Sequence, residues 1–221
     1  MKYFAIIVAG GSGKRMSDTV PKQFLLLNGE PLLFHSIRTF YNCAQKPEII
    51  VVTDPAHSRQ WDLLCAEYDF TIPHTMVDGG KERFHSVKNG LESIKENGIV
   101  AVHDGARPLL TTALAEHAFR SAELYGSAVP AVKPADSLRF NNKPIDRNLI
   151  YLIQTPQAFD VKSLKLAYNR DHAPELTDDA TVAEANGITV QLIEGERNNI
   201  KITWPADLEL AEALIKQRTP Q

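Results

Sequence analysis

The fold is decided by residues 4–16, which read FAIIVAGGSGKRM. Phe4 to Val8 is a continuous apolar run, as expected for a strand that is buried on both faces of a sheet. A glycine-rich turn follows at once, and it ends in two basic residues, Lys14 and Arg15. Glycines allow backbone N–H groups to close around a phosphate, so this order indicates an α/β protein with an anion site after its first strand.

Short apolar runs alternate with helical patterns along the rest of the chain. Further strands are predicted at residues 48–53, 75–77, 99–103, 127–132, 151–154 and 189–193, and helices at residues 32–43, 57–68, 83–96, 111–125, 161–169, 178–186 and 205–217. Repeated strand–helix units predict a Rossmann-like, mostly parallel sheet with helices on both faces, in one domain over residues 1–221. Ligands of such sheets bind beyond the carboxyl ends of the strands.

One segment breaks the alternation. Residues from Lys133 to Leu149 contain two prolines, the pair Asn141-Asn142 and charges of both signs. This composition is typical of a hairpin and not of a core element. We therefore expect a protruding arm at about residues 134–150.

Composition excludes several classes of protein. The chain has 221 residues, 43% of them apolar, and a net charge of -3, which favours a globular protein and argues against a general nucleic-acid binder. Two cysteines are too few for a disulfide framework, so we expect reduced thiols and a cytoplasmic location. No stretch approaches the roughly 20 apolar residues that a membrane-spanning helix needs.

The glycine-rich turn differs from two familiar nucleotide motifs. Gly11-x-Gly13 lacks the third glycine of a dinucleotide fingerprint, and the spacing of a P-loop is also absent. Lys14 and Arg15 favour a polyphosphate ligand over NAD, so an NAD-linked oxidoreductase is disfavoured. A further cation, Lys22, follows Pro21 and is anchored by an apolar run that begins at Phe24. A lone lysine is usually a solvated surface residue, but its closeness to the turn favours a function.

These two motifs resemble the nucleotidyltransferases that make nucleotide-sugars and nucleotide-alcohols. Within that group, they are most similar to the 2-C-methyl-D-erythritol 4-phosphate cytidylyltransferase family of the non-mevalonate isoprenoid pathway. Five more regions resemble this family in the same order: DGGKERFHSV at 78–87, VHDGARP at 102–108, DRN at 146–148 with TPQAF at 155–159, TDDA at 177–180, and GERNNIKIT at 195–203. The resemblance spans residues 3 to about 215.

The resemblance implies transfer of a cytidylyl group from CTP to 2-C-methyl-D-erythritol 4-phosphate, with Mg²⁺ as cofactor. It implies three catalytic cations: Arg15, Lys22 and Lys201. The implied CTP-binding residues are Ala9, Gly10, Gly11, Ser12, Gly13, Lys14, Gly80, Ser86, Asp104 and Gly105. Asp104 is also the implied metal-site residue. The implied acceptor-binding residues are Arg107, Ser137, Arg147, Thr155 and Thr177. Arg147 would reach the partner's site from the arm of a homodimer.

Three departures from the family pattern stand out. Gly105 replaces an alanine, residues 133–137 (KPADS) differ at the root of the arm, and Trp204 replaces a charged or small polar residue. Gly105 would leave the backbone free to approach the ribose, and Trp204 would alter the wall of the pocket.

Two other functions remain open from the sequence. Ribitol-5-phosphate cytidylyltransferase shares the loop, the PKQF segment and the CTP site, although the fuller DRN and TDDA matches favour methylerythritol. A catalytically silent nucleotide-binding subunit would lose its cations, and the retention of Arg15, Lys22 and Lys201 argues against it. Single residues also have plain structural interpretations: the TDDA segment is an ordinary helix N-terminus, and His103 shapes its loop and does not transfer protons.

Overall fold

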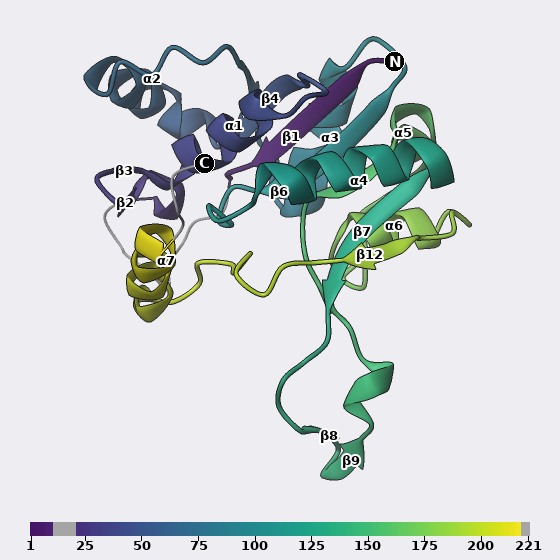
Figure 1. Cartoon of the computed structure of the whole chain (residues 1–221). Helices are drawn as coiled ribbons and strands as arrows, with labels where there is room; N and C mark the ends of the chain where they lie inside the picture. The colour runs from purple at the N-terminus through teal and green to yellow at the C-terminus, as the bar shows by residue number, and fades with distance from the viewer. Residues whose placement is uncertain (11–20, 218–221) are drawn as a thin grey trace.

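The fold is a layered α/β arrangement whose strands and helices follow the alternation in the sequence (Figure 1). The computed structural model describes residues 1–10 and 21–217. The strands are β1 (Tyr3–Val8), β2 (Leu26–Leu27), β3 (Glu30–Pro31), β4 (Glu48–Thr53), β5 (Thr75–Asp78), β6 (Ile99–Asp104), β7 (Ser127–Val132), β8 (Leu138–Phe140), β9 (Lys143–Ile145), β10 (Leu152–Ile153), β11 (Gln157–Asp160) and β12 (Leu192–Glu194). The α-helices are α1 (Leu32–Asn42), α2 (Ser58–Glu67), α3 (Arg83–Ser93), α4 (Thr112–Tyr125), α5 (Val161–Ala167), α6 (Asp179–Glu184) and α7 (Pro205–Gln217).

The main sheet has the strand order β10-β7-β11-β6-β1-β4-β5, with β12 paired to β7. Strands β6, β1, β4 and β5 run parallel, and β12 runs parallel to β7. The register places Asp104 beside Val8 and Thr53 beside Asp78. The carboxyl ends of four strands therefore meet at one edge of the sheet, where a ligand is expected.

Alternate residues of β1 explain why helices cover both faces of the sheet. Ala5 and Ile7 pack into an apolar cluster with residues of α1, α2 and α4. Phe4 and Ile6 point to the other face and pack with residues of α3, α5 and α6. Side chains of a strand alternate between faces, so an unbroken apolar run buries both. The predicted fold class is confirmed.

A third, smaller apolar cluster lies outside the main sheet. It joins the short hairpin β2–β3 to the C-terminal helix α7 through five buried residues: Leu27, Leu32, Leu109, Ile202 and Ala211. Ile202 is fully buried and follows Lys201 in the chain. The cluster thus fixes the backbone next to that lysine.

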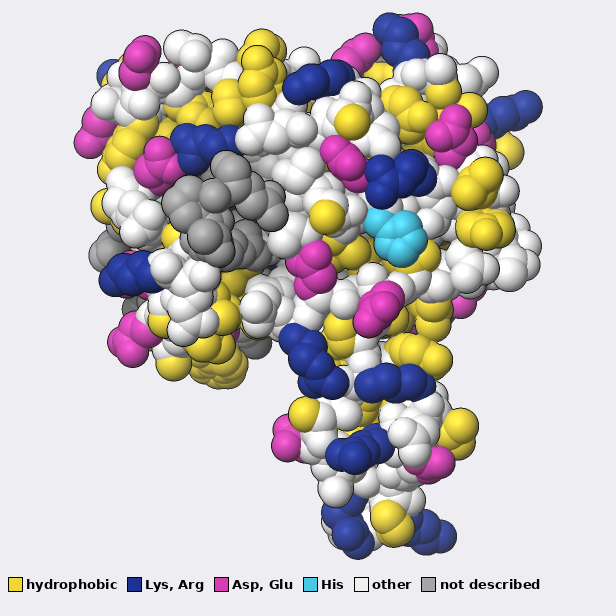
Figure 2. Space-filling view, viewed as in Figure 1, with side chains coloured by type: hydrophobic (Ala, Val, Ile, Leu, Met, Phe, Trp, Pro, Cys, Tyr) yellow, Lys and Arg dark blue, Asp and Glu magenta, His cyan; other side chains and the backbone are white. Residues whose placement is uncertain are grey.

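The predicted arm is present as a hairpin that projects from the body (Figure 1). Strands β8 and β9 pair antiparallel across Asn141 and Asn142, which both have positive φ angles of 48° and 63°. Asparagine tolerates this backbone region better than most residues, so the Asn-Asn pair suits the hairpin turn. Figure 2 shows the arm as a narrow projection that carries both basic and apolar side chains.

Several predicted boundaries were wrong. The helix predicted at residues 83–96 ends at Ser93, because Ile94 turns to an extended conformation and packs into the core. Strand β11 was not predicted, and both β10 and β11 run antiparallel to their neighbours in a region expected to continue the parallel pattern. The strand predicted at residues 189–193 lies at Leu192–Glu194.

None of the helices in the described part of the chain combines the length and the apolar character needed to cross a bilayer. The two cysteines lie in the body of the protein, Cys43 buried and Cys65 half-buried. Burial raises the pKa of the Cys43 thiol to about 12 and that of Cys65 to about 11, so both stay protonated at neutral pH.

Candidate active site

A cavity of about 520 Å³ opens at the carboxyl edge of the sheet. Its described lining comes from segments that are distant in sequence: residues 8–10, 22–23, 54, 80–83, 86, 104, 106 and 201. Seven of the residues predicted for the site line it: Ala9, Gly10, Lys22, Gly80, Ser86, Asp104 and Lys201. Gly11, Ser12, Gly13, Lys14 and Arg15 lie outside the described residues.

The wall formed by residues 79–86 is built on close backbone contacts. Gly79 donates its N–H to the carbonyl of Thr53 at 2.6 Å, which ties the turn to the end of β4. Gly80 donates its N–H to Ser86 Oγ at 3.0 Å, and Ser86 donates its hydroxyl to the carbonyl of Glu82 at 3.2 Å. A Cβ atom at Gly80 would lie only 2.3 Å from the Cβ of His85. Glycine is therefore required here by close packing.

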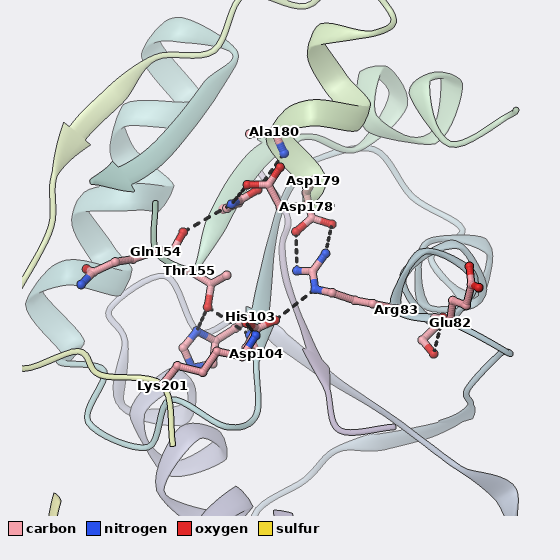
Figure 3. A network of polar contacts seen from close by, with 12 residues as sticks. Glu82, Arg83, His103, Asp104, Gln154, Thr155, Asp178, Asp179, Ala180 and Lys201 are labelled. Carbon is pink, nitrogen blue, oxygen red and sulfur yellow. Dashed lines mark hydrogen bonds and ion pairs between the residues drawn. The ribbon is translucent and has the colours of Figure 1, made fainter. Parts of the chain in front are cut away.

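Asp104 is the central anion of the site (Figure 3). Arg83 donates Nε–H to its Oδ1 at 3.0 Å, and Lys201 donates from Nζ to its Oδ2 at 2.8 Å. Burial alone would raise the pKa of the carboxyl, but the two cations oppose this and hold the pKa well below its usual range. Asp104 is thus ionised at neutral pH, with both oxygens occupied.

The other side of Arg83 is fixed by a second carboxylate. Its Nη1 and Nη2 donate to the two oxygens of Asp179 at 3.1 and 2.7 Å, and Tyr168 donates its hydroxyl to Asp179 Oδ1 at 2.6 Å. Burial would lower the pKa of Arg83, yet Asp179 and Asp104 raise it well above its ordinary value. Arg83 therefore carries a permanent charge shared between two carboxylates.

The backbone at Asp104 is held by a separate ring of hydrogen bonds. Thr155 accepts the N–H of Asp104 at 3.1 Å, and its Oγ1 lies 3.0 Å from His103 Nδ1. His103 Nε2 lies 3.1 Å from the carbonyl of Arg107, which can only accept, so Nε2 carries the proton and Thr155 donates to Nδ1. Arg107 donates to the carbonyl of Asn199, and Asn199 donates to the carbonyl of Thr155, which closes the ring.

This ring depends on a neutral histidine. His103 is fully buried, and burial lowers its pKa to about 4. It therefore carries no charge at neutral pH and shapes the loop, as expected from the sequence. Thr155 and Arg107, predicted to bind the acceptor, lie in this supporting ring and outside the described lining of the cavity.

Two lysines from opposite ends of the chain meet at the cavity. Lys22 Nζ donates to the carbonyl of Ile202 at 2.8 Å, and Lys201 is the residue before it. Both side chains line the cavity, as predicted. The small cluster that buries Ile202 thus sets the positions of both lysines.

The remaining predicted residues lie elsewhere. Gly105 is buried and donates its N–H to Val8, and a Cβ there would meet Leu33 Cδ1 at 2.9 Å, so it serves close packing beneath the site. Ser137 and Arg147 are exposed on the arm, where Arg147 donates to the carbonyl of Ala135 at 2.6 Å. Thr177 is exposed just before α6. A single described chain does not bring the arm residues to the cavity.

Three members of the network were not assigned from the sequence: Arg83, Tyr168 and Asp179. Arg83 belongs to the quoted motif at residues 78–87, but its partner Asp179 is 96 residues away. Asp179 follows the N-cap Asp178 and was interpreted as an ordinary acidic residue of a first helical turn. The sequence would reveal the Arg83–Asp179 pair only if it showed that these two charged positions, which lie in separate motifs, contact each other in the fold.

The fold and this site define a nucleotidyltransferase-like α/β protein. The sequence profile described as 2-C-methyl-D-erythritol 4-phosphate cytidylyltransferase (IspD) matches residues 3–217. The chain belongs to this family, and it is an enzyme of the nucleotidyltransferase class.

Individual relatives agree over almost the whole chain. The protein of that name from Azobacteroides pseudotrichonymphae is 46% identical over 217 residues, covering 96% of this chain and 98% of its own. The one from Bacteroides thetaiotaomicron is 42% identical, covering 97% and 100%. The crystal structure of the Thermus thermophilus protein is 31% identical and superposes with a TM-score of 0.79, covering 98% of this chain and 100% of its own.

Proposed function

We propose that this enzyme joins CTP to 2-C-methyl-D-erythritol 4-phosphate, giving 4-diphosphocytidyl-2-C-methyl-D-erythritol and pyrophosphate. The observation that carries the proposal is the meeting of Lys22, Lys201 and Asp104 at one cavity beyond the carboxyl ends of the strands. The names of the relatives supply the acceptor and the cytidylyl group, and CTP is the donor that the resemblance implies.

The chemistry needs cations more than it needs a base. An oxygen of the acceptor phosphate attacks the α-phosphorus of CTP, a new P–O bond forms, and the bond to the β-phosphate breaks in line with it. The attacking phosphate is already ionised near neutral pH. The barrier comes from bringing two anions together and from charge that grows on the phosphoryl oxygens, so positioning and cationic stabilisation supply the catalysis.

The residues divide between the two substrates. Lys22, with Arg15, stabilises the α-phosphate, and Lys201 holds the attacking phosphate beside it. Gly80 and Ser86 form the wall against which the cytosine lies. Lys201 lines the cavity and is paired with Asp104, so its ammonium can exchange that carboxylate for the phosphate of the acceptor.

A divalent cation fits this site as a companion of the triphosphate. The described residues contain no group of three or more His, Cys, Asp or Glu side chains able to hold a metal ion by themselves. Mg²⁺ commonly uses one or two carboxylates together with substrate phosphates, and Asp104 is a permanently ionised carboxylate in the cavity. Asp104 would hold Mg²⁺, which when bound neutralises charge on the phosphate oxygens.

The acceptor site is completed by a second copy of the chain. Ser137 precedes β8 and Arg147 follows β9 of the arm, and neither residue is part of the described lining of the cavity. Apolar side chains are exposed on and around the arm, with Phe140 66% and Leu149 75% exposed. A groove of about 640 Å³ at its root is lined in part by Tyr151 and Leu192. Exposed apolar surface of this kind suits a dimer in which each arm reaches the partner's site.

A coupled assay of pyrophosphate release tests the proposal. The four nucleoside triphosphates are each paired with methylerythritol phosphate and with ribitol 5-phosphate at equal concentration, with Mg²⁺. We expect turnover with CTP and methylerythritol phosphate. A preference for ribitol 5-phosphate would show that the acceptor is ribitol 5-phosphate, and CTP binding without pyrophosphate release would indicate a catalytically silent subunit.

The proposed location is the cytoplasm, which cell fractionation would test.

A further inference from the structure

Arg83 connects two carboxylates that belong to different parts of the fold. Asp179 stands at the first position of α6 and is completely buried, and Asp104 stands at the end of β6. Arg83 is the first residue of α3 and contacts both with three different nitrogens (Figure 3). Among the described residues, no other side chain contacts two carboxylates through three nitrogens.

The geometry of this contact makes Arg83 rigid. Two parallel hydrogen bonds to Asp179 fix the plane of the guanidinium group. Tyr168, itself 1% exposed, donates to Asp179 Oδ1 and fixes the carboxylate in turn. With the plane fixed, Nε–H has one direction, and it points at Asp104 Oδ1. A lysine at this position would offer a single nitrogen and could not serve both carboxylates in this way.

The contact also divides the charge of Asp104 between two cations. Arg83 occupies Oδ1 and Lys201 occupies Oδ2. A carboxylate shared with Arg83 attracts Lys201 less strongly than one that has Lys201 as its sole partner. Arg83 therefore affects how readily Lys201 leaves Asp104 for a phosphate.

We propose that Arg83, held in place by Asp179 and Tyr168, is a positioning residue that orients Asp104 and keeps Lys201 available for the acceptor phosphate. The proposal rests on the proposed function for the role of Lys201 in turnover. Its structural part, the sharing of Asp104 between Arg83 and Lys201, does not depend on which acceptor is used.

The first test uses Tyr168→Phe, which removes one hydroxyl outside the described cavity lining and retains the ring. We expect kcat to fall about 3- to 10-fold, with a smaller change in the Kd for CTP measured by calorimetry. Tyr3→Phe is the matched control, because Tyr3 also donates to a carboxylate, Glu123, on the exposed surface. Its kcat should equal that of the unmodified enzyme. An unchanged kcat in Tyr168→Phe would overturn the proposal.

The second test asks whether the effect passes through Lys201. Arg83→Lys keeps the charge, and this lysine is expected to pair with the fully buried Asp179 and leave Asp104 to Lys201 alone. We expect kcat to fall on the order of 100-fold. In a Lys201→Gln background the further loss caused by Arg83→Lys or Tyr168→Phe should almost disappear, because effects that share one route are not additive. If the kcat losses of the single variants multiply in the double variants, the effect of Arg83 does not pass through Lys201, and the proposal is refuted.

A third measurement needs no substrate. Acetylation of lysines is followed by mass spectrometry, with the exposed Lys162 as the internal reference. In Arg83→Lys, Asp104 holds the Lys201 ammonium more strongly, so Lys201 should react several-fold more slowly than in the unmodified enzyme. An equal rate would overturn the sharing of Asp104. The two proposals can fail separately. If the unmodified enzyme releases no pyrophosphate but Arg83→Lys still slows the acetylation of Lys201, the proposed function fails and the positioning role of Arg83 stands.

Discussion

Asp104 and Lys201 are 97 residues apart in the chain, and Lys201 Nζ lies 2.8 Å from Asp104 Oδ2. The first residue ends a central strand, and the second lies in the segment between β12 and α7. Arg107 binds the backbone of Asn199 in the same segment, and Ile202 donates its N–H to Ala106. Hydrogen bonds from the loop after β6 therefore hold the segment that contains Lys201 at the cavity.

Lys22→Ala should reduce kcat on the order of 1000-fold, as the loss of a key cation does in other phosphoryl transfers. The half-buried side chain contacts the carbonyl of Ile202, so the folded structure should persist with only modest destabilisation. Steady-state kinetics and thermal unfolding measure the two effects. Lys162→Ala, which changes an exposed lysine on α5, serves as the control. Near-normal turnover of Lys22→Ala would remove Lys22 from the catalytic set.

Arg147→Ala should raise the KM for methylerythritol phosphate at least 10-fold and change the Kd for CTP much less. Arg139→Ala is the matched control, because Arg139 lies on the same arm, is exposed and donates to the carbonyl of Asn142 in the hairpin turn. Equal effects on both substrates would place Arg147 outside the acceptor pocket.

Mixing the Arg147→Ala and Lys22→Ala chains should restore activity. If the arm acts on the partner's site, a hybrid dimer has one site with both residues intact and one with neither. Random mixing makes half of the dimers hybrid, so at an acceptor concentration well below the normal KM, where both parent variants are slow, roughly a quarter of the normal activity should return. Sedimentation measures the dimer, and pyrophosphate release measures the recovery. No recovery in verified hybrid dimers would show that Arg147 acts within its own chain.

Acid should destabilise the protein through His103. Its folded pKa is about 4 and its unfolded pKa is about 6.5, so the unfolded chain binds this proton first as pH falls. Stability is therefore lost between about pH 6.5 and pH 4, by roughly 3 kcal/mol in total from this group. Urea unfolding at several pH values measures the slope. His103→Gln should flatten the slope over this window, and an unchanged slope would contradict a neutral buried His103.

Gly80→Ala should weaken CTP binding about 10-fold or more. The new Cβ would lie 2.3 Å from the Cβ of His85, which is attached to helix α3, so the turn must move. The moved turn loses the contact with Ser86 that shapes the wall of the cavity. Calorimetry with CTP measures the effect, and circular dichroism checks that the fold remains. Unaltered affinity would show that CTP does not depend on this wall.

The sequence predicted the parts of the fold that depend on local pattern. Strands β1, β4, β6 and β7 each contain an apolar run and lie within a residue of the predicted bounds. The helix predicted from residue 111 is present as α4, and Thr111 caps it by accepting the N–H of Leu114. Strand β11 could not be predicted, because it is four residues long and includes two polar ones. Its place between β6 and β7 is set by pairing with strands distant in sequence.

The site shows the same division between residues that a local pattern reveals and residues that only the folded chain brings together. Lys22, Gly80, Asp104 and Lys201 were found because each follows a strand or belongs to a motif, and all four line the cavity. Arg83 was missed, since its importance comes from Asp179, which only the folded chain brings near. Thr155 was assigned to the acceptor, which stays a prediction, and its support of the Asp104 backbone, whose N–H it accepts, was not foreseen. Residues that support others through buried hydrogen bonds leave no local signal in the sequence.

The small apolar cluster around Ile202 also bears on how the enzyme would lose activity. It contains five buried residues, far fewer than either cluster on the main sheet, and it holds the backbone that both lysines share. Regions with few apolar contacts open at lower free energy than the core. During gradual denaturation, inactivation should therefore come before the loss of secondary structure, and the C-terminal helix would be the first element to detach.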